Sequence, residues 1–95
     1  MCEMSDLEWL FQVIEDRRAK PKPGSYTNEL FDAGEDRIVQ KVGEEAIEVV
    51  IAAKGQGDAR LISELADLTY HVLVLLAHKG LSPDDVLAEL ERRHR

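Results

Sequence analysis

The sequence predicts an all-α fold, a helical bundle with two long antiparallel central helices and shorter flanking helices. Three observations predict it: apolar residues recur at helical spacing along most of the 95 residues, the breaks fall at Gly and Pro, and no segment alternates as a strand does. The length fits one domain spanning residues 1–95. Because so short a chain buries a limited share of its surface, we expect dimerisation to complete the bundle.

The first expected helix begins at a capping box, Ser5-Asp6-Leu7-Glu8, and runs to about Arg18. Its apolar face has helical spacing and consists of Leu7, Leu10, Phe11 and Ile14. Pro21 and Pro23 end the helix, so residues 20–25 are expected to form an exposed loop.

A short helical turn is expected next, capped by Thr27 and carrying Leu30 and Phe31. Gly34 suits the left-handed residue that would end this turn.

Two long helices are expected over residues 35–54 and 59–79, separated by Gly55-Gln56-Gly57. Asp58 is expected to cap the second, and Gly80 to end it. Helical periodicity assigns the first helix an apolar face of Ile38, Val42, Ala46, Val49 and Ala53. It assigns the second a face of Leu61, Leu65, Leu68, Val72, Leu75 and Leu76. A hydroxyl cap, a proline and two acids in Ser82-Pro83-Asp84-Asp85 then predict a last helix that continues to the C-terminus.

The charge balance excludes some classes of function. With 12 Lys and Arg against 19 Asp and Glu, the net charge is −7, which argues against a general nucleic-acid binder. The single cysteine, Cys2, can form neither an internal disulfide nor a metal quartet. The N-terminus lacks the features of a signal peptide, and the longest apolar stretch, residues 72–77, is too short to span a bilayer. We therefore expect a soluble, cytoplasmic protein without a membrane or nucleic-acid partner.

Acidic residues gather on both long helices. Glu44, Glu45 and Glu48 lie within one turn of the first, and Glu64 and Asp67 lie on the second. A short Gly-rich turn makes consecutive helices antiparallel neighbours. A symmetric turn centred on Gln56 then places Glu48 level with Glu64, and Glu45 level with Asp67, so the two clusters face each other.

Carboxylates gathered in this way repel one another and raise one another's pKa, a cost that a divalent cation relieves. Ligands that offer only oxygen select Mg²⁺ or Mn²⁺ over zinc, and Mg²⁺ readily binds substrate phosphates. The pattern therefore predicts metal-assisted chemistry on a phosphate ester or anhydride. The alternative is an ordinary solvated acidic face, which is the usual meaning of a single Glu-x-x-Glu.

Basic residues beside the acids fit a phosphorylated ligand. Arg37 and Lys41 fall on the acidic edge of the first long helix, where simple salt bridging to Glu44 and Glu45 is the alternative. Lys20 and Lys22 are positioned to close over a ligand from the loop, or else to remain solvated. His71 lacks the cysteine or further histidine of a zinc site, so we expect a structural or ligand-contacting role for it.

These motifs resemble a known family. Glu44-Glu45-Ala46-Ile47-Glu48 with Glu64-Leu65-Ala66-Asp67 resembles the paired motifs of the MazG-type all-α nucleotide pyrophosphohydrolases. Ser25-Tyr26-Thr27, Lys41-Val42-Gly43-Glu44-Glu45-Ala46 and the segments 64–71 and 80–86 narrow the resemblance to the phosphoribosyl-ATP pyrophosphohydrolases of histidine biosynthesis. It covers nearly the whole chain.

The resemblance implies hydrolysis of the α–β phosphoanhydride of phosphoribosyl-ATP to phosphoribosyl-AMP and pyrophosphate. It implies a helical homodimer with the site near the subunit interface. The metal ligands that it implies are Glu44, Glu45, Glu48, Glu64 and Asp67.

On this basis Glu45 or Glu48 is expected to accept the proton of the attacking water. The residues expected to contact the substrate are Tyr26, Thr27, Asn28, Arg37, Lys41 and His71. Two rival functions stay open: a housekeeping nucleoside triphosphate pyrophosphohydrolase, and a non-catalytic helical adaptor or oligomerisation module.

Overall fold

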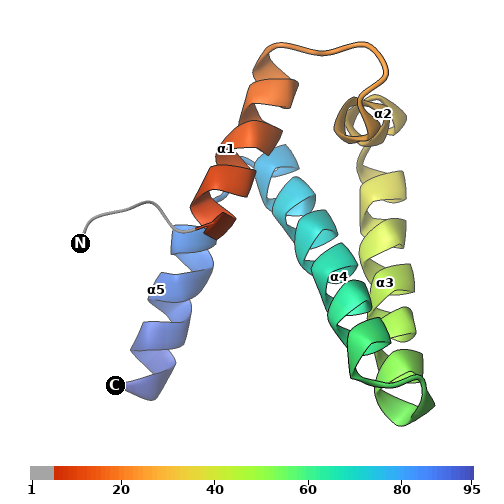
Figure 1. Cartoon of the computed structure of the whole chain (residues 1–95). Coiled ribbons are helices and arrows are strands. Elements are labelled where there is room, and N and C mark those ends of the chain that lie inside the picture. Colours follow the sequence, from red (N-terminus) through yellow and green to blue (C-terminus); the bar gives the residue numbers. More distant parts are fainter. Residues whose placement is uncertain (1–5) are drawn as a thin grey trace.

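The computed structural model describes residues 6–95 and contains only helices there (Figure 1), which confirms the all-α prediction. Its five helices are α1 (Asp6–Ala19), α2 (Tyr26–Ala33), α3 (Glu35–Gly55), α4 (Asp58–His78) and α5 (Pro83–His94). The predicted cap Ser5 and the single cysteine, Cys2, lie outside the described residues.

The helix ends confirm some of the predicted caps and correct two. Ser25, not Thr27, caps α2, because the Asn28 backbone N–H donates to Ser25 Oγ at 3.3 Å. Gly57, not Asp58, is the N-cap of α4, and Asp58 is already its first helical residue. The predicted start of α5 is confirmed, with Ser82 as N-cap, and a capping box completes it: the Ser82 backbone N–H donates to the Asp85 carboxylate at 2.9 Å.

The centre of the fold is an antiparallel hairpin of α3 and α4, the two long helices that Figure 1 shows side by side. Helices α1 and α2 pack on the end of the hairpin away from its Gly-Gln-Gly turn, and the core lies there. The buried apolar side chains of this core are Ile14, Leu30, Ile38, Leu73, Val74 and Ala77. Few buried apolar side chains lie in the half of the hairpin near the turn, so other side chains fill the contact between α3 and α4 there.

The seam between α3 and α4 differs from the predicted apolar faces. Glu64 and His71 of α4 are buried, whereas Leu65, predicted to face inward, is 42% exposed. On α3 the buried residue near the turn is Ala52, and the predicted Ala53 is exposed. The helices thus meet along a stripe that includes the acidic positions, because paired helices pack on residues spaced three and four apart. Glu45 and Glu64 lie within this contact, whereas Glu44 and Asp67 are exposed at its edge.

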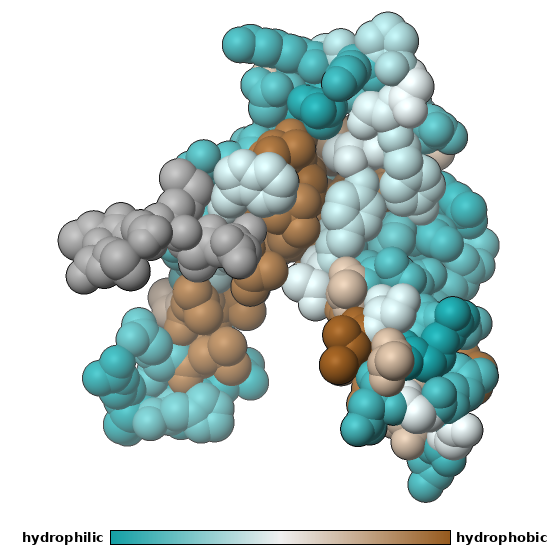
Figure 2. Space-filling model, viewed as in Figure 1, coloured by the Kyte–Doolittle hydropathy of each residue, from teal (hydrophilic) through white to brown (hydrophobic). Residues whose placement is uncertain are grey.

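Large apolar side chains are consequently exposed on the outer faces of the hairpin and on α5. They are more than two-fifths exposed at Ile47, Val50, Ile51, Ile62, Leu65, Val86, Leu87 and Leu90. Helix α5 leads away from the other four (Figure 1), and Figure 2 shows hydrophobic residues running from α5 toward the C-terminal part of α4. Contiguous exposed apolar surface of this kind is typical of a protein–protein contact.

One helix, α4, is long and apolar enough to cross a membrane by length and composition alone. The core helix of a soluble protein passes the same test, and α4 contributes Leu73, Val74 and Ala77 to the core of this fold. Its middle also carries the buried Glu64 and the exposed Asp67. Here α4 acts as the central helix of the bundle.

Candidate metal and phosphate site

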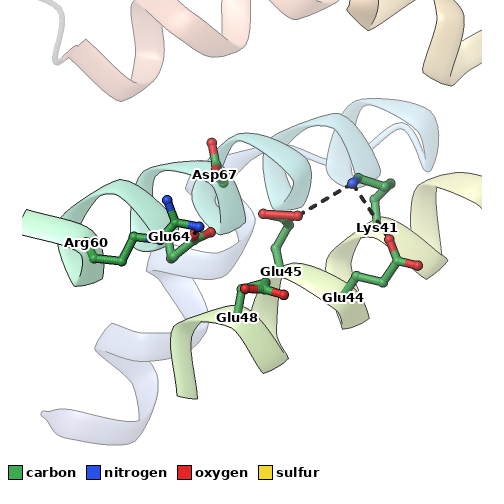
Figure 3. A pocket seen from close by; sticks show the side chains of 7 residues that line it. All are labelled: Lys41, Glu44, Glu45, Glu48, Arg60, Glu64 and Asp67. Carbon is green, nitrogen blue, oxygen red and sulfur yellow. Dashed lines mark ion pairs between the residues drawn. The ribbon is translucent and has the colours of Figure 1, made fainter. Parts of the chain in front are cut away.

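An open pocket of about 590 Å³ lies on the α3–α4 hairpin, on the side where the two acidic clusters meet (Figure 3). Five carboxylates and two cationic side chains line it: Lys41, Glu44, Glu45, Glu48, Arg60, Glu64 and Asp67. All five acids predicted from the sequence are therefore brought to one pocket. Glu45 of α3 meets Asp67 of α4 there, as the predicted antiparallel register requires.

Three of the carboxylates form the centre of the site. Glu45 on α3 and Glu64 and Asp67 on α4 each offer an oxygen, and these oxygens all lie within 4.8 Å of one another. The Glu45 side chain is 12% exposed and that of Glu64 is 5% exposed, whereas Asp67 is open to solvent. The trio is thus open to solvent on the Asp67 side, with two largely desolvated carboxylates behind it.

Glu44 and Glu48 line the same pocket outside this central trio. Glu44 is about half exposed at the rim, and the Gln40 amide donates to its carboxylate at 2.9 Å. That hydrogen bond lowers the pKa of Glu44 despite some desolvation, and the positive charges of Lys41 and Arg37 lower it further. The prediction that crowding raises the pKa of these carboxylates is therefore wrong for Glu44, because the nearby hydrogen-bond donor and the positive charges outweigh like-charge repulsion.

Two cations meet the acids from opposite ends of the pocket (Figure 3). Lys41 Nζ lies 3.7 Å from Glu44 and 3.5 Å from Glu45, which confirms the simple salt bridging considered for this lysine. Arg60 Nη2 lies 2.7 Å from Glu64 Oε2. Since Glu64 is buried, this partner supplies the counter-charge that a desolvated carboxylate requires.

Sequence reasoning missed Arg60. The signal was present, because Arg60 stands four residues before Glu64 on one helix, the spacing at which side chains meet. What the pattern did not reveal was that Glu64 is buried.

The aromatic end of the site lies one turn beyond Asp67, where α2 meets α4. Tyr26 Oη lies 3.0 Å from His71 Nε2, and the hydroxyls of Thr27 and Tyr70 hydrogen-bond to each other. The rings of Tyr26 and Tyr70 stack with centroids 6.1 Å apart. Of these residues Tyr26 remains 44% exposed and is the one with surface left for a ligand.

Asn28 is buried and fully engaged by backbone groups. Its Nδ2 donates to the Arg17 carbonyl at 2.7 Å, and its Oδ1 accepts from the Lys22 backbone N–H at 2.8 Å. Asn28 therefore fixes the 20–25 loop between α1 and α2. Arg37 is exposed and is not among the residues that line the pocket, although its charge acts on Glu44.

The chemistry of the central trio fits a hard divalent cation. Its donors are all carboxylate oxygens, with no sulfur or imidazole among them, and two of the three come from buried or nearly buried side chains. Oxygen donors of this kind suit Mg²⁺ or Mn²⁺. Lys41 and Arg60 offset part of the negative charge and are placed to contact an anionic ligand.

Comparison with known proteins identifies relatives of this chain. The family model for phosphoribosyl-ATP pyrophosphohydrolase matches residues 7–94. The chain is 57% identical to a protein named phosphoribosyl-ATP pyrophosphatase from Pelotomaculum thermopropionicum, over all of this chain and 97% of that protein. It is 53% identical to one of the same name from Limosilactobacillus fermentum (95% of this chain, 85% of the relative). A third, from Listeria welshimeri, is 56% identical (88% and 81%).

Proposed function

Since the chain belongs to the phosphoribosyl-ATP pyrophosphohydrolase family, we propose that it hydrolyses the α–β phosphoanhydride of 1-(5-phosphoribosyl)-ATP. The products are phosphoribosyl-AMP and pyrophosphate, in the second step of histidine biosynthesis. The observation that carries the proposal is that carboxylate oxygens of Glu45, Glu64 and Asp67 lie within 4.8 Å of one another. The pocket around them is also lined by two cationic side chains, Lys41 and Arg60.

The proposal includes a divalent cation, Mg²⁺ with Mn²⁺ as a substitute. Glu45, Glu64 and Asp67 would hold it, with Glu44 and Glu48 at the edge of the same pocket. When bound, the cation neutralises phosphate charge and lowers the pKa of a coordinated water. The carboxylates would fix the position of the cation, and the cationic side chains of Lys41 and Arg60 that of the phosphate chain.

Glu48 is the carboxylate best placed to act as general base. It lines the pocket but lies outside the trio of closest oxygens, and none of the ion pairs of the described residues engages it. Glu45, the other candidate, is already paired with Lys41. A carboxylate free of metal and of cations is the one able to accept the proton of an attacking water.

Two residues on the α2 side of the pocket would contact the substrate. Lys41 would pair with phosphate oxygens, exchanging its carboxylate contacts for them. Tyr26 would present its exposed ring to the nucleoside, while Thr27, Asn28 and His71 hold α2 and its loop in place behind it. Arg37 remains a candidate only for long-range attraction of the anionic substrate, since it does not line the pocket.

The experiment that tests the proposal compares pyrophosphate release from phosphoribosyl-ATP, ATP and dUTP in the presence of Mg²⁺. We expect phosphoribosyl-ATP to give the highest kcat/KM. Glu48→Gln should keep the helical circular dichroism and lose about 10²-fold or more in kcat. Glu29→Gln, an exposed glutamate on α2, is the matched control and should retain wild-type turnover.

Preference for ATP or dUTP would favour the housekeeping pyrophosphohydrolase. Absence of turnover on all three would favour the adaptor. Near-normal turnover of Glu48→Gln would remove Glu48 from the mechanism.

We also propose that the enzyme is a homodimer of the cytoplasm, where a substrate built on ATP is found. The support for a dimer is the exposed apolar surface of α5, which carries Val86, Leu87 and Leu90, and the apolar groove of about 200 Å³ between α5, α1 and α4. Leu87→Glu should reduce the mass measured by light scattering, whereas Ala88→Glu, its exposed neighbour, is the control. A wild-type monomer at micromolar concentration would refute the dimer.

A further inference from the structure

The two cations of the pocket stand at opposite ends of the carboxylates, and the two ends differ in character. Arg60 lies in the first turn of α4, next to the Gly-Gln-Gly turn, whereas Lys41 lies toward α2 (Figure 3). Arg60 and Asp67 are seven positions apart on α4, a rise of about 10 Å. This is long enough for a phosphate chain to lie along the pocket with a different group at each end.

The end near α2 suits a nucleoside. Residues 35–69 contain no aromatic side chain, so neither α3 nor the part of α4 that lines the pocket offers one. The next aromatic residue along α4 is Tyr70, whose ring stacks with that of Tyr26 on α2. Tyr26 is 44% exposed, and its hydroxyl is hydrogen-bonded to His71, which lies one turn beyond Asp67 on α4. A purine base gains from stacking on such a ring, and the turn end of the hairpin provides no equivalent.

The end near the turn suits a free phosphate group. The Arg60 guanidinium uses Nη2 to bind Glu64 at 2.7 Å, and the arginine side chain is 56% exposed. A guanidinium has five N–H donors in a rigid fork, so the donors that do not face Glu64 can bind phosphate oxygens. The buried Glu64 carboxylate anchors the guanidinium, which reduces the conformational entropy lost when a phosphate binds.

From this arrangement we propose that Arg60 binds the leaving pyrophosphate, so that the substrate lies with its terminal phosphate at the hairpin turn and its nucleoside at α2. The inference rests on the proposed function, because it assigns a direction to the substrate of that site. Arg60 is a specificity-determining contact for the leaving group, and Tyr26 is its counterpart for the nucleoside. Neither Arg60 nor Tyr26 contacts the whole substrate.

The test measures binding of each product separately, by calorimetry with Mg²⁺ present, using inorganic pyrophosphate and AMP as the two probes. Arg60→Gln is the main variant, because the amide still donates to the buried Glu64 and the fold is kept. It should weaken pyrophosphate binding about tenfold and change AMP binding less than twofold. Arg60→Lys should recover part of the loss. Tyr26→Leu should show the reverse pattern.

Lys54→Ala is the matched control, since Lys54 is an exposed cation in the last turn of α3 that does not line the pocket. Equal loss of pyrophosphate binding in Lys54→Ala and Arg60→Gln would overturn the inference, because it would reflect net charge only. Equal loss of both probes in Arg60→Gln would overturn it as well. Because these assays need no turnover, they are independent of the proposed reaction, whose failure would appear as no hydrolysis of phosphoribosyl-ATP by the wild type.

Discussion

Tyr26 and His71, 45 residues apart in sequence, are joined by a hydrogen bond of 3.0 Å between Oη and Nε2. The other ring nitrogen, Nδ1, lies 2.7 Å from the Asp67 carbonyl oxygen. Because a carbonyl only accepts, Nδ1 carries the proton, Nε2 is the acceptor and the tyrosine hydroxyl donates. The same turn of α4 that presents Asp67 to the pocket thus also holds the first residue of α2.

Tyr26→Phe should destabilise the fold without changing its helix content. The variant leaves His71 Nε2 buried without a donor, which costs about 1–3 kcal/mol of the free energy of unfolding. Urea denaturation followed by circular dichroism measures it. Thr69→Ala is the control, because the Thr69 hydroxyl donates to the Leu65 carbonyl one turn earlier on the same helix. Equal losses in the two variants would show that the Tyr26–His71 bond contributes nothing of its own.

Mg²⁺ should raise the melting temperature of the wild type and do so less in Asp67→Asn. A ligand that binds only the native state stabilises it by about 2.7 kcal/mol at a hundred times its Kd. Asp67 is exposed, so its replacement by an isosteric amide removes a ligand oxygen's charge without disturbing the core. Asp32→Asn on α2 is the control. A Mg²⁺ shift of the same size in all three proteins would place the cation elsewhere.

The positions of the acids were predictable because they depend on local geometry. A helix of known pitch and a short turn are sufficient to place Glu45 opposite Asp67, and no other part of the chain enters that argument. The same local logic identified Ser82 as the cap of α5 and Gly34 as the end of α2.

The errors arose where distant residues decide. Ser25 caps α2 because the Thr27 hydroxyl is bonded to Tyr70, 43 positions away. Leu65 is exposed and Glu64 buried because α3 and α4 pack on a stripe that a helical wheel of either helix alone does not identify. The pairing of Arg60 with Glu64 was missed for the same reason, since its importance depends on the burial of the carboxylate.

Stability should fall in acid partly through Glu35, which joins the start of α3 to the end of α4. Lys79 Nζ lies 2.9 Å from Glu35 and His78 Nε2 lies 3.4 Å from it. The hydrogen bond and charge of Lys79, with a smaller contribution from His78, lower the pKa of Glu35 below its ordinary value of 4.5. A carboxyl whose pKa is lower in the folded state contributes stability above its unfolded pKa, and loses it as pH falls through the folded pKa.

Glu35→Gln should therefore lower the melting temperature slightly at pH 7, and the difference should disappear as the pH falls through the lowered pKa of the wild-type Glu35 carboxyl. The effect is small because the pair is exposed and screened by salt. A difference between wild type and variant that does not change with pH would show that the side chain acts through packing and not through its charge.

Two glycines should respond to alanine in opposite directions. Gly34, between α2 and α3, has φ +98° and ψ −179°, a conformation that essentially only glycine adopts, so Gly34→Ala should cost about 1–3 kcal/mol. Gly43 lies inside α3, where an added Cβ meets nothing within 4 Å. Gly43→Ala should therefore stabilise the helix by about 0.5–1 kcal/mol. Urea denaturation of both variants at two protein concentrations measures the difference. If Gly43→Ala instead destabilises the protein and lowers its mass in solution, a second chain packs against Gly43, and the dimer covers this face of α3 beside the acidic pocket.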